Sequence, residues 1–142
     1  MGLLGAISRE SIYIAAVART LALTRPVKPD ARITIADWTG RWAREQAGAP
    51  ALLYKDKIIT YAALEKGANR YAQWAAHTGL KKGDVVTLLM ENCPDYIMAW
   101  LGLTRAGCVA ALVNTNLTGQ PLGHSVNLAS AKHLLQIGRA HV

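Results

Sequence analysis

The stretch that most constrains this chain, residues 84–116, follows a strand, helix, strand pattern. Val85–Met90 is an almost unbroken apolar run, which is typical of a strand buried on both faces in a parallel sheet. Asn92 is predicted to cap the following helix, and Gly107 to end it where a left-handed backbone costs least. Residues 108–113 are predicted to form a second interior strand. The stretch has the size of a right-handed βαβ crossover, so an α/β fold is expected.

Similar patterns predict the elements around this crossover. Two short apolar runs around Lys55 and Asp56 indicate a hairpin. Thr60 is expected to cap a helix on one side only, because a capping box needs Glu or Gln where Ala63 stands. Gly79 is expected to end that helix. The predicted elements are helices at 3–24, 34 to about 48, 60–78 and 121–130, and strands at 51–54, 57–60 and 133–135.

All four tryptophans fall on predicted helices beside apolar neighbours. Core packing explains them better than stacking on nucleic-acid bases. Trp38 and Trp42 share one helical face with Ile35, so that face is predicted to pack inward. Trp74 and Trp100 lie on the helices before and after the first crossover strand. The last predicted helix is expected to turn inward Leu122, Val126 and Ala129.

The composition indicates one folded domain with a basic surface. The chain has 142 residues, too few for two domains of ordinary size. Its 51% hydrophobic and 18% charged content is that of a chain that forms a core. The formal net charge of +7 favours anionic partners such as a membrane surface or a nucleotide. Nucleic acid is not a predicted partner, because no long basic run and no RNA- or DNA-binding signature is present.

Residue types that bind metals or react with oxidants are scattered along the chain. Cys93 and Cys108 form no Cys-x-x-Cys pair and are expected to be reduced structural thiols. The four histidines lack the spacing of metal ligands, and His124 is expected to be solvated or structural. No metal-binding residue is therefore predicted.

The amino-terminal segment, residues 3–24, is apolar with interruptions. Its longest uncharged run, 11–18, is far shorter than the roughly 20 residues that a spanning helix needs. Arg9 also interrupts the apolar core that a signal peptide would require. Two interpretations stay open: a helix lying in a membrane interface with Arg9, Arg19 and Arg25 toward lipid phosphates, or a helix packed on its own protein.

Several short motifs, in order, resemble one enzyme family. They are Ala-Leu-Leu-Tyr at 51–54, Thr-Tyr-Ala-Ala-Leu at 60–64, Ala-Asn-Arg-Tyr-Ala at 68–72, Leu-Lys-Lys-Gly-Asp-Val-Val at 80–86 and Asn-Thr-Asn-Leu at 114–117. Together with the crossover they resemble the amino-terminal part of the adenylate-forming acyl-CoA synthetases. The last motif favours the long-chain and very-long-chain fatty acyl-CoA synthetases of the fatty-acid-transport-protein type. The resemblance implies an incomplete α/β subdomain with a parallel or mixed sheet and flanking helices.

The resemblance also implies a two-step reaction in the full-length enzyme. A fatty acid and ATP form an acyl-adenylate and pyrophosphate, and coenzyme A then displaces AMP. ATP, Mg²⁺ and coenzyme A are implied for that enzyme, and none is expected to bind this fragment.

No catalytic, cofactor-binding or metal-binding residue is assigned to the chain. It has no Gly-x-x-x-x-Gly-Lys-Ser/Thr segment, and residues 118–123 lack a basic residue, so they are predicted to begin a helix. Asn114 and Asn116 follow a parallel strand, where ligands bind in open sheets, but turn formation explains them better.

The predicted organisation has three parts: an amphipathic helix and linker at 1–32, a partial synthetase subdomain at 33–135, and a terminal segment at 136–142. The terminal segment contains Ile-Gly-Arg-Ala-His-Val, which matches the translation of a common sequencing adapter, so it is expected to be non-native.

Two functional hypotheses follow from these patterns. The first is a part of a fatty acid–CoA ligase that is inactive alone. The alternative is a small basic, non-catalytic module at a membrane or on a partner protein. The expected location is cytoplasmic or peripheral on the cytoplasmic face of a membrane, with residues 1–24 as the contact.

Overall fold

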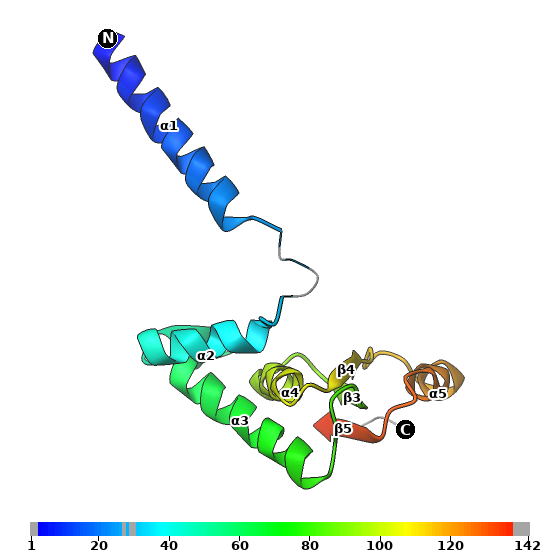
Figure 1. Ribbon diagram of the computed structural model, residues 1–142. Coiled ribbons are helices and arrows are strands. Elements are labelled where there is room, and N and C mark those ends of the chain that lie inside the picture. The colour runs from blue at the N-terminus through cyan, green and yellow to red at the C-terminus, as the bar shows by residue number, and fades with distance from the viewer. Residues whose placement is uncertain (1–2, 27, 29–30, 138–142) are drawn as a thin grey trace. The chain divides into compact units, whose positions relative to one another are not determined.

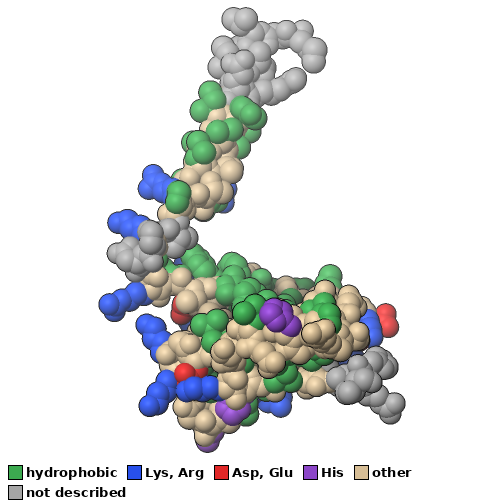
Figure 2. Space-filling model, turned by 90° about the vertical axis from the view of Figure 1, so that its right-hand side faces the viewer, with side chains coloured by type: hydrophobic (Ala, Val, Ile, Leu, Met, Phe, Trp, Pro, Cys, Tyr) green, Lys and Arg blue, Asp and Glu red, His purple; other side chains and the backbone are tan. Residues whose placement is uncertain are grey.

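The computed structural model describes residues 3–26, 28 and 31–137. The chain divides into two compact units, residues 1–32 and 33–142 (Figure 1). The first unit contains α1 (Leu3–Leu23), a helix of 21 residues whose side chains from Ser11 onward are exposed. No helix among the described residues is both long and apolar enough to cross a membrane. Figure 2 shows hydrophobic side chains at the surface of both units.

The second unit is built on a three-stranded parallel sheet. β3 (Val85–Met90) lies at its centre, with β4 (Val109–Leu112) on one side and β5 (His133–Ile137) on the other. α4 (Pro94–Arg105) connects β3 to β4. The βαβ crossover and the α/β fold are therefore confirmed. The second strand was predicted to be interior, which is wrong in this chain, because β4 is an edge of the sheet and is shorter than predicted.

The ends of α4 follow from local chemistry, with one correction. Cys93 is the cap residue, in extended conformation, and not Asn92 as predicted. Pro94 occupies the first helical turn, where its fixed φ suits the helix, so the cap falls on the residue just before it. Gly107 follows the helix at φ 77°, as expected of a residue without a side chain to clash.

The hairpin and the following helix agree with the sequence prediction. β1 (Pro50–Tyr54) and β2 (Lys57–Thr60) pair in antiparallel fashion around a turn that places Lys55 at φ 51°. The hydroxyl oxygen of Thr60 accepts a 3.2 Å hydrogen bond from the amide of Ala63 and starts α3 (Tyr61–His77). Gly79, at φ 75°, follows the helix.

The inward face of α2 (Ile35–Glu45) was predicted wrongly for Ile35 and Trp38, whereas Trp42 is half-buried. Its buried residues are Ala36, Thr39 and Gly40, whereas Ile35 and Trp38 are 44% and 43% exposed. A methyl group on Gly40 would lie 3.4 Å from Nη2 of Arg105, which shows how closely this face approaches its neighbours. Small residues therefore decide the orientation of α2, because they allow dense packing that bulky rings would prevent.

The core lies between the sheet and the pair α3 and α4 (Figure 1). Gly102 is essential to this packing, since a Cβ there would clash with the carbonyl oxygen of Ala68 and lie 2.6 Å from Cβ of Tyr71. Gly67 is similar, because a Cβ there would overlap the side chain of Met98. The main buried cluster consists of Ala75, Val86, Leu88, Met90, Ala99, Leu103 and Cys108. Trp74 and Trp100 pack against it as partly buried side chains.

The helix between β4 and β5 lies on the side of the sheet away from α4, and its bounds are shifted from those predicted (Figure 1). α5 (Gly119–Leu128) begins two residues before the predicted start. None of its side chains is fully buried. Leu122 and Val126 are half-buried, so they turn inward only in part. β5 includes Gln136 and Ile137, so the strand runs two residues past the predicted 133–135. Residues 138–142 of the predicted non-native segment lie outside the described residues.

Candidate functional site

The parallel strands end at one edge of the sheet, where open α/β sheets bind ligands. A groove of about 490 Å³ lies there, at the ends of β3 and β4. We call it the carboxyl-edge groove. It is lined by Met90, Glu91, Asn92, Tyr96, Leu112, Val113, Asn114, Thr115 and Asn116.

Asn114 and Asn116 both line this groove, as the strand pattern predicted. Oδ1 of Asn114 accepts a 2.9 Å hydrogen bond from the backbone amide of Asn116. This bond forms an Asx turn, the conformation in which a side chain replaces a backbone acceptor. The preference for turn formation is therefore confirmed for Asn114.

Two titratable groups beside the sheet, Tyr71 and Cys108, have raised pKa values, which favour their neutral forms. Burial raises the pKa of the Tyr71 phenol, and the negative charge of Asp95 raises it further. Burial likewise raises the pKa of the Cys108 thiol, with a smaller effect from Asp84. A protonated thiol is a poor nucleophile, so Cys108 suits the structural role that the sequence predicted.

The glycine-containing segment 118–123 and His124, which the sequence analysis also considered, have the structural roles that it favoured. Thr118 caps α5, so the glycine-containing segment 118–123 begins a helix as expected. His124 is exposed. Within the described ranges, no three His, Cys, Asp or Glu side chains are grouped so that they could hold a metal ion.

Arg105 forms a cluster that the sequence did not reveal. Its guanidinium donates 2.8 Å hydrogen bonds to both carboxylate oxygens of Glu65 and a 3.1 Å bond to the carbonyl of Ala36. It also donates to Oδ1 of Asn69. The ion pair is about three-quarters buried and joins α2, α3 and α4. In the sequence, Arg105 is recognisable only as a basic residue in the last turn of a helix. That position does not reveal its partners, which lie 36 to 69 residues away along the chain.

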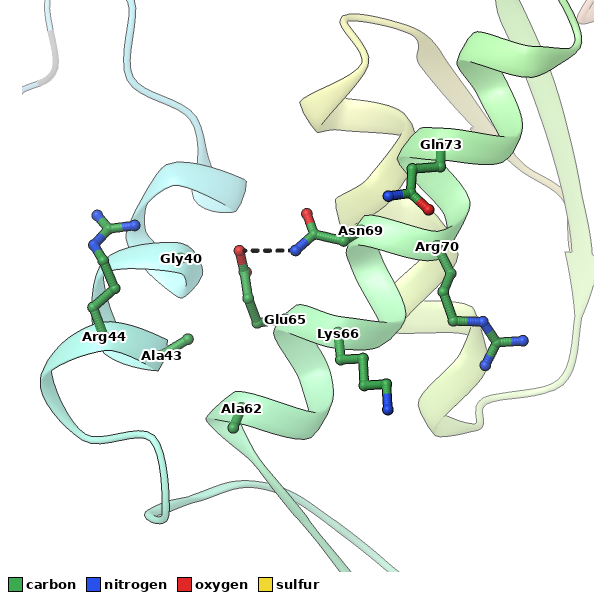
Figure 3. Close-up of a pocket in the computed structure, with 9 residues that line it drawn as sticks. All are labelled: Gly40, Ala43, Arg44, Ala62, Glu65, Lys66, Asn69, Arg70 and Gln73. Carbon is green, nitrogen blue, oxygen red and sulfur yellow. Dashed lines mark hydrogen bonds between the residues drawn. The ribbon is translucent and has the colours of Figure 1, made fainter.

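Beside this cluster lies a second open groove, of about 530 Å³, between α2 and α3. We call it the α2–α3 groove. Figure 3 shows Arg44 on the α2 side, Lys66 and Arg70 on the α3 side, and the hydrogen bond from Asn69 to Glu65 between them. The groove is lined by Gly40, Ala43, Arg44, Ala62, Glu65, Lys66, Asn69, Arg70 and Gln73.

Comparison with known proteins gives one family and a consistent set of relatives. The family described as AMP-binding enzyme matches residues 39–141. Long-chain fatty acid transport protein 6 of Homo sapiens is 36% identical over 104 residues, 72% of this chain and 17% of that protein. Medium/long-chain-fatty-acid–CoA ligase FadD6 of Mycobacterium tuberculosis is 36% identical over 84 residues, 59% of this chain and 14% of that protein.

The fold has solved counterparts. The N-terminal domain of FACL13 from Mycobacterium tuberculosis superimposes with a TM-score of 0.69 and 26% identity. The match covers 73% of this chain and 27% of that chain. The chain thus spans less than a fifth of the curated relatives described above. The matched span contains most of the segment 136–142, whose predicted non-native origin stays a prediction.

Proposed function

Because the chain belongs to the AMP-binding enzymes, as a part related to fatty acid–CoA ligases, we propose that it works within an ATP-dependent fatty acid–CoA ligase. The match to this family over residues 39–141, together with relatives named for fatty acid transport and CoA ligation, carries the proposal. The proposed substrate is a fatty acid, which ATP converts to an acyl-adenylate and coenzyme A to the thioester.

The contribution proposed for these residues is structural. The described residues hold no phosphate-binding loop and no group of carboxylates suited to Mg²⁺, so they do not fit the metal or the polyphosphate of ATP. We therefore derive no catalytic step from this chain. Its residues build a sheet edge and two packed helices on which a catalytic centre formed by other parts of the enzyme would rest.

The test is pyrophosphate release from ATP and oleate. We expect the chain alone to give the background rate, because the groups that hold ATP lie elsewhere. A longer polypeptide that adds the phosphate-binding region should release pyrophosphate in the same assay. Release above background by the chain alone would contradict the structural role.

The alternative of an autonomous basic module has no support from the comparisons. One part of that hypothesis, contact with a membrane surface, remains as a proposal for α1. Ile14, Val17 and Leu21 share one face of this helix, and Arg19 lies on the other. We propose a peripheral location on the cytoplasmic face. If α1 is the contact, deleting residues 1–24 should weaken co-sedimentation with anionic vesicles, whereas unchanged co-sedimentation would exclude it.

A further inference from the structure

The charges around the α2–α3 groove are not balanced within the groove. Its one carboxylate, Glu65, already accepts hydrogen bonds from Arg105 at both oxygens. Throughout the described part of the chain, no hydrogen bond or ion pair engages the side chain of Arg44, Lys66 or Arg70. The rim of the groove therefore presents three exposed cations whose counter-charge is not supplied by the groove itself.

The spacing of two of these cations is unfavourable for the helix that carries them. Lys66 and Arg70 are four residues apart on α3, so their charges lie one turn apart on the same face. Like charges at this spacing destabilise a helix. On α2, by contrast, Arg41 at the same spacing is paired with Glu45 at 2.7 Å. The α3 pair is thus not explained by the stability of the helix.

The shape of the groove leaves room beside these cations. Its walls include Gly40, Ala43 and Ala62, which have almost no side chain. Its volume of about 530 Å³ is ample for a phosphate group with its substituent. Figure 3 shows the small residues between the two helices, with Arg44 extending from the outer side of α2 and Lys66 and Arg70 extending from α3 away from α2.

We propose that the α2–α3 groove is an anion site for a phosphate-bearing ligand. Lys66 and Arg70 extend from the same side of α3, where an ammonium and a guanidinium suit phosphate oxygens, and Arg44 adds a positive charge from α2. The same chemistry is supplied by a phosphodiester headgroup in a lipid surface or by a free phosphate compound. The site is separate from the carboxyl-edge groove and does not depend on the proposed ligase activity.

The test compares two charge-matched variants of the intact chain, both taken from the monodisperse fraction. Lys66→Gln/Arg70→Gln removes two groove cations while keeping good helix formers. The control, Lys57→Gln/Lys82→Gln, removes two exposed cations elsewhere. Each protein is titrated with phosphatidylcholine vesicles with and without phosphatidylglycerol, and separately with inorganic pyrophosphate. Circular dichroism confirms that each variant is folded.

We expect the groove variant to lose affinity on the order of tenfold or more for one of the two probes, and the control to retain it. Loss toward the vesicles identifies a lipid headgroup as the source, and loss toward pyrophosphate identifies a free phosphate compound. An equal loss in both variants would show attraction by net charge only and overturn the proposal. No binding of either probe by the unaltered chain would overturn it as well.

Discussion

The two faces of the sheet differ in how completely this chain covers them. The closed face, toward α3 and α4, holds Val86, Leu88 and Met90, all buried. The open face, toward α5, carries Val109 on edge strand β4 and Leu134 on edge strand β5. Their side chains are 52% and 42% exposed. Segments adjacent in the sequence complete the closed face, whereas α5, without a fully buried side chain, covers the open face only in part.

Thr87 gives the open face a second distinguishing feature. It alternates with Val86 and Leu88 along β3, so its side chain points to the opposite side. The side chain is fully buried, yet its hydroxyl has no hydrogen-bond partner among the described residues. An unpaired buried hydroxyl costs about 1–3 kcal/mol. We expect other parts of the proposed longer enzyme to complete this face.

The largest effect should come from truncating a side chain on the closed face. Leu88→Ala should lower the free energy of unfolding by about 2–5 kcal/mol, because it leaves a cavity in a dense cluster. Leu134→Ala on the open face should cost about 1 kcal/mol or less, since water already reaches that side chain. Urea denaturation measures both. Equal losses would show that the two faces are packed alike.

A matched pair of glycines sharpens the comparison at the level of helices. Gly102→Ala should destabilise the chain by about 1–3 kcal/mol, because the new Cβ meets the backbone of Ala68 in the α3–α4 contact. Gly123→Ala on α5 meets nothing within 4 Å and should stabilise by roughly 0.5–1 kcal/mol. Opposite shifts in melting temperature are expected. A destabilised Gly123→Ala would mean that α5 is as tightly packed as α4.

The smallest effect should be the acid sensitivity of the junction with β5. A 2.8 Å ion pair with Lys132 lowers the pKa of Asp84, and a backbone hydrogen bond from Lys81 lowers it further. The stabilisation is present above the unfolded-state pKa of about 3.9 and is lost as the pH falls through the lower folded-state pKa. Asp84→Asn should therefore flatten the dependence of the urea midpoint on pH in the acid range. Identical pH profiles for both proteins would exclude this contribution.

Local patterns predicted most of the second unit. The apolar run of β3, the cap at Thr60 and the glycines after α3 and α4 are short-range signals, and the structure confirms each. The errors arose where several neighbours compete, as with Asn92, which yields the cap position to Cys93 because Pro94 fixes the start of the helix. The turn at Asn114 was predicted correctly because, like a helix cap, it depends on a hydrogen-bond partner only two residues away.

The sequence by itself determined which segments are helices and strands, because hydrogen bonding and apolar periodicity act over a few residues. Only the tertiary structure decided which faces pack and which charges meet. α2 turns Ala36 and Gly40 inward in place of Trp38, because close contact with its neighbours leaves no room for a ring. Arg105 finds Glu65 40 residues away. That pairing neutralises the one carboxylate of the α2–α3 groove and leaves its cations exposed, a consequence of helix packing that no local pattern contains.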